Sequence, residues 1–129
     1  MTIDHVAVWT GDLEQLVKFY CRYFGAETGE KYVNQAKGFA SRFLQFEDGC
    51  RMEVMTSSTL SLTGAAAGAQ RMGLTHLAFA AGSEEAVDEL TARLRMEGHV
   101  VADGPRRTGD GCYESVVLDP DGNRVEITA

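Results

Sequence analysis

The sequence predicts a mixed α+β fold made of two copies of one unit, each a strand, a helix and then three strands. A histidine lies in a short apolar run near the start of each half, in DHVAVW and in THLAFA. Each half also closes with Asp-Gly, three residues and a glutamate. The histidines lie 71 residues apart and the glutamates 73 residues apart. Because these landmarks recur in one order at nearly one offset, we interpret the chain as an internal repeat.

The elements of the first half follow from residue spacing. Residues 3–10 alternate as a strand does, and apolar residues at helical spacing then predict a helix that ends at Gly25. Those apolar residues are Leu13, Leu16, Val17, Tyr20 and Phe24. We expect strands near residues 31–34, 41–47 and 50–56, the last two joined by a tight turn at Asp48 and Gly49.

The second half repeats this order. A strand at residues 74–80 precedes a helix that Ser83 caps and that ends at Gly98. Strands near residues 100–102, 113–118 and 124–128 complete the unit. Residues 57–73 are rich in Ser, Thr, Ala and Gly and predict a linker or loop, with a short helix at 64–69 as the alternative. The expected organisation is one domain over 1–129, with modules at 1–56 and 74–129.

Composition restricts the classes of function. The 129 residues are 44% hydrophobic and 24% charged, which is typical of a globular chain of one domain. The net charge of −7 argues against nucleic acid as a partner, because phosphate binding needs a basic face. The sequence shows no apolar run near the ~18 residues of a membrane span and no signal-peptide pattern. We therefore expect a cytoplasmic protein that acts on a small molecule without a membrane.

Strand parity gives two histidines and two glutamates a common environment. His5, Glu53, His76 and Glu126 each lie opposite bulky apolar neighbours, which we expect to pack against the helices. The four side chains then face the concave side of the sheet. Imidazoles and carboxylates buried together are costly unless a cation compensates them. Neutral histidine nitrogen and carboxylate oxygen suit Zn, Ni, Co, Mn or Fe(II), so the four residues predict one divalent metal site.

Alternatives exist for single residues of this set. A lone histidine in a strand is more often a core or surface residue than a metal ligand, and a glutamate in a final strand is usually solvated. The interpretation as a metal site therefore rests on the symmetric placement of all four residues, not on any one of them. His99 has no counterpart in the first half, and we interpret it as a cap at the end of the second helix.

These residues resemble the vicinal oxygen chelate superfamily, which includes glyoxalase I, methylmalonyl-CoA epimerase, fosfomycin-resistance proteins and extradiol dioxygenases. The resemblance covers the whole chain and includes the LDPDGNRVEI segment that contains Glu126. It implies paired βαβββ modules that form an incomplete barrel around the metal. The order His, Glu, His, Glu is similar to short bacterial glyoxalase I. It implies a lyase that isomerises a thiol hemithioacetal of an α-ketoaldehyde, such as methylglyoxal, through an enediolate, with Ni, Co or Zn.

The same resemblance implies roles for the two carboxylates. Glu126 is the principal base, and Glu53 is its partner on the opposite side of the substrate. Arg51 and Arg124 each precede a glutamate by two residues, and each binds a substrate anion, orients the carboxylate or lies in solvent. These alternatives stay open from the sequence.

Substrate contacts are less similar to those of glyoxalase I. That enzyme has an arginine four residues after the first ligand, which holds the glutathione carboxylate, and an asparagine four residues after the second. This sequence has Trp9 and Ser57 at those positions, and Arg71 is the candidate for the arginine expected before His76. Trp9 and Met55 form an apolar wall of the cavity or simply pack. The thiol therefore stays open.

Other members of the same scaffold are alternatives to the lyase: an isomerase, a thiol transferase, a ring-cleaving dioxygenase, or a binding and resistance protein without catalysis. We also expect a homodimer, because such modules leave sheet edges that pair with a partner. The metal site is then formed either within one chain or by His5 and Glu53 of one chain with His76 and Glu126 of the other.

Overall fold

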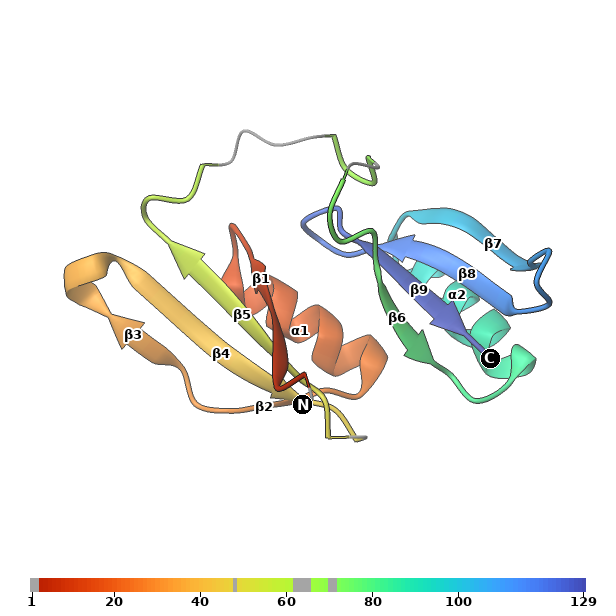
Figure 1. Cartoon of the computed structure of the whole chain (residues 1–129), viewed down its shortest axis with the longest axis horizontal. Helices are drawn as coiled ribbons and strands as arrows, with labels where there is room; N and C mark the ends of the chain where they lie inside the picture. Colours follow the sequence, from red (N-terminus) through yellow and green to blue (C-terminus); the bar gives the residue numbers. More distant parts are fainter. Residues whose placement is uncertain (1–2, 48, 62–65, 70–71) are drawn as a thin grey trace. The chain divides into compact units, whose positions relative to one another are not determined.

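The computed structural model describes residues 3–47, 49–61, 66–69 and 72–129. The chain divides into two compact units, residues 1–64 and 65–129. Each unit is an open sheet with one helix against one of its faces (Figure 1). The predicted mixed α+β class is confirmed.

The first unit contains a sheet in the order β1-β5-β4-β2, with β3 paired to β4. Its elements are β1 (His5–Trp9), α1 (Leu13–Phe24), β2 (Glu27–Thr28), β3 (Tyr32–Asn34), a 3-10 turn (Gln35–Lys37), β4 (Phe39–Gln45) and β5 (Arg51–Ser57). The three predicted strands after the helix are present as β3, β4 and β5. Strand β2 was not predicted from the sequence, because two residues are too few to show alternation. The predicted turn at Asp48 lies outside the described residues.

Helix α1 begins and ends where its sequence predicts. The Asp12 side chain accepts a hydrogen bond from the backbone N–H of Gln15 at 3.0 Å, which satisfies one of the free amides of the first turn. Gly25 ends the helix with φ of 66°, a conformation that glycine adopts without steric strain. The buried face of α1 packs against β4 and β5 and consists of Leu13, Leu16, Val17, Phe19 and Tyr20.

The second unit contains a sheet in the order β6-β9-β8-β7. Its elements are β6 (Leu77–Ala80), α2 (Glu84–Met96), β7 (Val101–Arg107), β8 (Tyr113–Leu118) and β9 (Arg124–Thr128). The strand predicted at 74–80 begins only at Leu77, so His76 directly precedes it. Strand β7 is longer than the predicted 100–102, because its pairing with β8 continues through two register shifts, the second of which accommodates Gly104 and Pro105.

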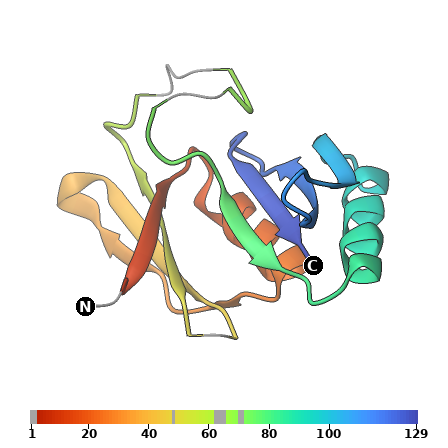
Figure 2. The same cartoon turned by 45° about the vertical axis from the view of Figure 1, so that its right-hand side comes forward.

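Helix α2 lies along one face of this sheet, against β7 and β8 (Figure 2). Ser83 caps it as predicted, accepting a hydrogen bond from the Ala86 amide at 3.2 Å. At its other end, the His99 backbone N–H donates to the Leu94 carbonyl at 3.0 Å. Neither α1 nor α2, the helices described here, has the length and apolar character needed to cross a bilayer.

The turn between β8 and β9 is built around one buried carboxylate. Asp119 accepts hydrogen bonds from the backbone amides of Asp121 and Asn123 at 3.0 and 2.8 Å, and from the Asn123 side chain at 2.9 Å. Gly122 has φ of 82°, and an added Cβ there would lie 2.7 Å from the Cβ of Ala67. The turn therefore fixes the β8–β9 register, which determines where Glu126 lies.

The segment between the units is described only in part. Residues 66–69 form a turn at Ala67 and Gly68 rather than the alternative short helix. Residues 62–65 and 70–71 lie outside the described residues, so the linker at 57–73 and the single domain over 1–129 stay predictions.

Candidate metal and substrate site

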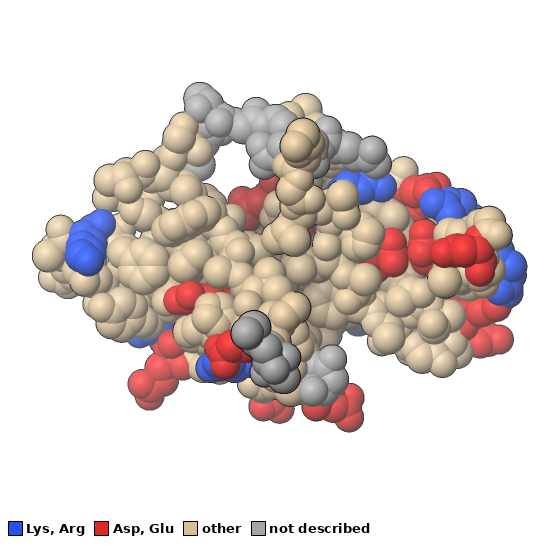
Figure 3. All heavy atoms as spheres, in the orientation of Figure 1, with Lys and Arg blue, Asp and Glu red and all other residues tan. Residues whose placement is uncertain are grey.

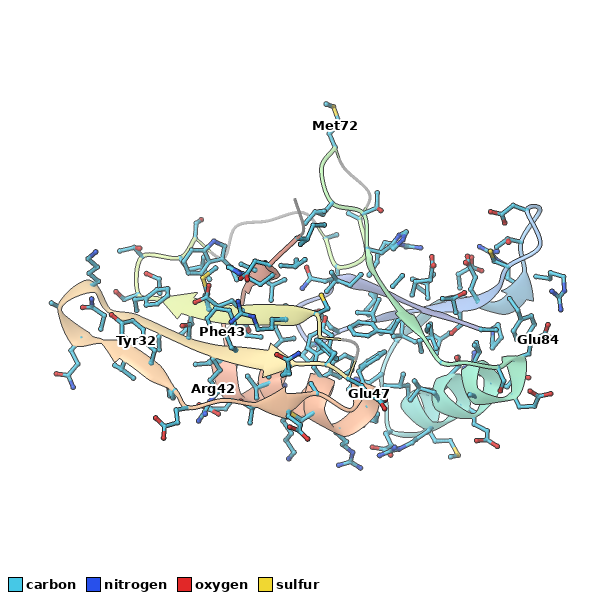
Figure 4. The ribbon with its side chains drawn as sticks, turned by 60° about the horizontal axis from the view of Figure 1, so that its bottom comes forward. Tyr32, Arg42, Phe43, Glu47, Met72 and Glu84 are labelled. Atoms are coloured by element: carbon cyan, nitrogen blue, oxygen red, sulfur yellow. The ribbon has the colours of Figure 1, made fainter. Side chains whose placement is uncertain are left out.

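The predicted alternation of faces is present in both units. On β5, Glu53 is half-buried, whereas its neighbours Met52 and Val54 are buried on the side of α1. On β9, Glu126 is half-buried between two buried apolar residues in the same way. Figure 4 shows the same alternation on β4, where Arg42 and Phe43 point to opposite faces of the sheet. The functional candidates of each unit thus lie on the face away from its helix.

Strand register brings one histidine and one glutamate together in each unit. The parallel pairing of β1 with β5 places Ala7 beside Glu53, and His5 is two residues earlier on the same face. The Nε2 atom of His5 lies 3.9 Å from Oε2 of Glu53. In the second unit, Nε2 of His76 lies 3.6 Å from Oε2 of Glu126. We call His5 with Glu53 the first half-site and His76 with Glu126 the second half-site.

The first half-site brings two hydrogen-bond acceptors to face one another. The Asp4 carboxylate lies 2.7 Å from Nδ1 of His5, and because a carboxylate only accepts hydrogen bonds, Nδ1 is the donor. In a neutral ring Nε2 then carries a lone pair, which faces a second acceptor on Glu53. Two facing acceptors repel, and a metal cation or another hydrogen-bond donor placed between them removes the repulsion.

The donor atoms fit a divalent metal. Histidine and carboxylate ligands bind Zn at about 2 Å, so two ligands of one ion lie at most about 4 Å apart. The separations of 3.9 and 3.6 Å are within this limit. Among the described residues, no group of three or more His, Cys, Asp or Glu side chains is placed to hold an ion. Each half-site therefore offers two donors.

Arg51 lies beside the first half-site and contacts Asp4. Its guanidinium forms an ion pair with the Asp4 carboxylate and lies 4.9 Å from the centre of the Phe43 ring. The His5 ring meets the same Phe43 ring edge to face at 5.3 Å. The hydrogen bond from His5 and the charge of Arg51 together hold the pKa of Asp4 below its usual value. Asp4 was not among the residues that the sequence analysis selected.

Trp9 and Met55 lie side by side, because the register of β1 and β5 pairs them. Trp9 is 49% exposed and meets Phe39 edge to face at 6.3 Å, and Phe39 contacts Tyr32 at 6.1 Å. We call Trp9, Phe39 and Tyr32 the aromatic row. Phe39 and Tyr32 were missed by sequence reasoning, because their adjacency to Trp9 depends on how β3 pairs with β4 and β4 pairs with β5.

The second half-site has a further carboxylate that sequence reasoning missed. Glu114 of β8 is only 14% exposed in its side chain, and burial followed by the charge of Glu126 raises its pKa. Arg106 opposes this effect from 3.7 Å, and Asp103 holds Arg106 at 2.6 Å. Glu114 occupies the position that Ser41 has in the first half, so comparing the two halves of the repeat does not reveal a carboxylate there. Strand parity on β8 was the available signal.

The remaining substrate candidates are placed only in part. Arg124 is half-buried on β9, two residues before Glu126, and its charge contributes to lowering the pKa of Asp103. Arg71 lies outside the described residues. In the view of Figure 3, the described Lys and Arg side chains form small separate groups, most of them beside Asp or Glu and one, at the left, among other residues.

The sequence is similar to a family profile and to one curated protein. The profile of the Glyoxalase/Bleomycin resistance protein/Dioxygenase superfamily matches residues 2–127. An uncharacterized protein of Bacillus subtilis, YqjT, is 42% identical over 62 residues, which cover 46% of this chain and 48% of that protein. The matched segment thus spans about half the length of this curated relative.

Solved structures are similar over almost the whole chain. A glyoxalase/bleomycin resistance protein/dioxygenase domain from Frankia sp. EAN1pec has a TM-score of 0.81 at 16% identity, covering 99% of this chain and 96% of that one. The trypanothione-dependent glyoxalase I of Leishmania major has a TM-score of 0.76 at 22% identity, covering 99% and 86%. A putative glyoxalase from Bacillus halodurans has a TM-score of 0.77 at 25% identity, covering 98% and 94%. At these identities the similarity establishes the shared fold.

Proposed function

The chain belongs to the Glyoxalase/Bleomycin resistance protein/Dioxygenase superfamily, and on this premise we propose that it is a metal-dependent lyase of the glyoxalase I type. Its substrate is the hemithioacetal formed from an α-ketoaldehyde and a thiol. The observation that carries the proposal is the matching geometry of the two half-sites, with Nε2–Oε2 distances of 3.9 and 3.6 Å. Both pairs consist of donor types that suit Ni, Co or Zn, and also Mn or Fe(II).

The two histidines and two glutamates hold the ion in this proposal. When bound, the ion supplies Lewis-acid stabilisation of the negative charge that develops on two adjacent substrate oxygens. His5 and His76 donate through Nε2. The Glu53 and Glu126 side chains are 19% and 17% exposed, so each carboxylate is shielded by its sheet yet reachable from the face away from the helix.

Proton transfer is the work of the glutamates. Glu126 removes the proton from the carbon that bears sulfur, and the electron pair of that C–H bond moves into the carbon–carbon bond and onto the carbonyl oxygen. The proton then returns to the neighbouring carbon, and the hydroxyl proton of the carbon that bears sulfur moves to the neighbouring oxygen, which leaves the thioester of a 2-hydroxy acid. Glu53 is the partner of this base and lies on the opposite side of the substrate. Both steps conserve atoms and electrons and need no external oxidant.

A complete site takes one first half-site and one second half-site, from one chain or from two chains of a homodimer. Mixing a His5→Ala variant with a His76→Ala variant distinguishes the two arrangements. Shared sites recover metal binding and turnover in mixed dimers, because one of their two sites is then intact. Sites within one chain recover neither.

We propose that the aromatic row and Met55 contact the apolar part of the substrate or thiol. Trp9 is half-exposed and lies four residues after His5 on the same strand face. An indole cannot replace an arginine as a partner of a carboxylate, so a thiol less anionic than glutathione fits this wall. Arg124 and Arg71 remain the candidates for a substrate anion, whereas Arg51 is held by Asp4.

The exposed aromatic row also supports a second candidate, a binding protein that holds an apolar small molecule without reaction. Metal-free protein that retains such a ligand tightly, and shows no turnover after metal addition, favours the binder. Oxygen uptake by anaerobically prepared Fe(II) protein with a catechol tests the dioxygenase alternative. A cytoplasmic location and a homodimer are part of the lyase proposal.

The decisive experiment measures metal content and hemithioacetal turnover in the same samples. Protein purified without chelators is loaded with Ni, Co or Zn and assayed with methylglyoxal and several thiols. Glu126→Gln should lower kcat by roughly 10²–10⁴-fold, the range for loss of a general base. Glu89→Gln, at an exposed position of α2, is the matched control. Full turnover by Glu126→Gln would remove Glu126 as the base, and absence of turnover with every thiol would reject the lyase.

A further inference from the structure

We propose that Asp4 is a positioning residue for His5: its carboxylate fixes the tautomer and the orientation of the imidazole, so that Nε2 is presented toward Glu53. The inference rests on the proposed metal function of the first half-site. It concerns a residue that lies outside the set of four metal-ligand candidates.

The hydrogen bond between Asp4 and His5 carries the argument. Oδ2 of Asp4 lies 2.7 Å from Nδ1 of His5. A neutral imidazole in water exchanges between two tautomers, and only the form with hydrogen on Nδ1 donates to this carboxylate. The remaining lone pair is then on Nε2, the atom that lies 3.9 Å from the Glu53 carboxylate. Carboxylates that accept from a metal-bound histidine also raise the basicity of the ring.

Asp4 is itself held in place from two sides. Its side chain is 70% exposed, so a hydrogen bond to His5 alone would compete with water. Arg51 forms an ion pair with the same Oδ2 atom, and strand register places Arg51 directly beside His5. The Phe43 ring supports both partners, at 4.9 Å from the guanidinium and 5.3 Å from the imidazole. Asp4, Arg51 and Phe43 thus form one network that contacts His5.

The second half-site has no carboxylate at the equivalent position. Thr75 occupies the position equivalent to Asp4, and its hydroxyl lies 3.1 Å from Nδ1 of His76. A hydroxyl donates or accepts, so Thr75 does not impose a tautomer and brings no charge. The two half-sites therefore have similar donor geometry but different support. His5 is the histidine whose binding atom is set before a metal arrives.

The test compares Asp4→Asn with Thr75→Val. Asparagine keeps the shape of aspartate, but its amide both donates and accepts, so it no longer selects one tautomer. The ¹⁵N chemical shifts of the His5 ring in metal-free protein report the tautomer directly. Competition with a chromophoric chelator for Ni²⁺ gives the metal affinity. We expect hydrogen on Nδ1 in the wild type, a mixture in Asp4→Asn, and a loss of Ni²⁺ affinity of about 10–100-fold.

Thr75→Val should change the affinity less than Asp4→Asn, and Asp4→Glu should restore part of the tautomer selection. Hydrogen on Nε2 of His5 in the metal-free wild type would overturn the inference. So would an Asp4→Asn protein with the same ring shifts and the same Ni²⁺ affinity as the wild type. A wild type that binds no Ni²⁺, yet shows the tautomer change on Asp4→Asn, would reject the proposed metal function and keep the role of Asp4.

Discussion

The Nε2 atom of His5 lies 3.9 Å from Oε2 of Glu53, because the two residues are diagonal neighbours across the parallel pair β1 and β5. The parallel pair β6 and β9 places His76 and Glu126 in the same relation, at 3.6 Å. Parallel pairing places the two residues of each pair on one face through the backbone, whereas the direction of the His5 ring also depends on its contact with Asp4.

Metal binding should stabilise the fold through these pairs. A ligand that binds only the folded chain raises the free energy of unfolding by about 2.7 kcal/mol at 100 times its dissociation constant. Thermal unfolding with and without Ni²⁺ should therefore show a higher midpoint with the metal, and His5→Ala should lose most of that shift. His99→Ala removes an imidazole at the end of α2 and should keep the shift. An unchanged Ni²⁺ effect in His5→Ala would exclude His5 as a ligand.

The fluorescence of Trp9 can be used to detect binding at the aromatic row, because the chain has a single tryptophan. Its emission should change when S-benzylglutathione is added to metal-free protein, and should change less with glutathione, since the benzyl group contacts the aromatic row. Trp9→Arg should shift the ratio of kcat/KM values toward hemithioacetals of thiols that carry a free carboxylate. Met55→Leu, which nearly conserves volume, should leave this ratio unchanged. Equal emission responses to both compounds would argue against an apolar subsite.

Two buried hydroxyls join α2 to β8 and should behave as a coupled pair. Thr91 and Ser115 are 0% and 1% exposed, and their hydroxyl oxygens lie 2.6 Å apart. Thr91→Val or Ser115→Ala alone leaves the other hydroxyl without this partner, and each should lower the free energy of unfolding by about 1–3 kcal/mol. The double variant should lose less than the sum of the single losses. Urea unfolding of the four proteins measures this, and strict additivity would show that the two hydroxyls are not coupled.

Glu114 should make the fold less stable as pH rises. Burial and the charge of Glu126 raise its pKa in the folded chain, whereas the unfolded value is about 4.3. The folded chain therefore binds the proton more tightly, and stability falls as pH increases from the unfolded pKa through the folded pKa. Glu114→Gln has no carboxyl that titrates at this position, so it does not lose this part of the stability as pH rises. Its free energy of unfolding relative to the wild type should therefore be greater at pH 7 than at pH 4.

Unfolding in urea with a chelator present, at both pH values, separates this effect from metal binding. A relative stability of Glu114→Gln that is lower at pH 7 than at pH 4 would contradict the raised pKa. Glu89→Gln, at an exposed position of α2, controls for the loss of one negative charge on the same unit.

The sequence by itself determined the elements whose signals are local. Asp12 and Gly25 mark the ends of α1, and β8 and β9 have the predicted bounds, because caps and alternation act within a few residues. The same alternation identified Glu53 and Glu126 as residues facing away from the helices. The repeat also predicted that each half carries one histidine and one glutamate.

Only the tertiary structure decided what lies beside each of these residues. Strand β2 forms by pairing with β4, and the long, bulged β7 forms by pairing with β8, so neither is encoded by a pattern within its own residues. Asp4 with Arg51, and Glu114 near Glu126, come together through cross-strand register. Register joins residues far apart in the chain, and a shift by one residue would turn every side chain to the other face. The candidate ligands were therefore visible in the sequence, whereas their supporting network depended on the fold.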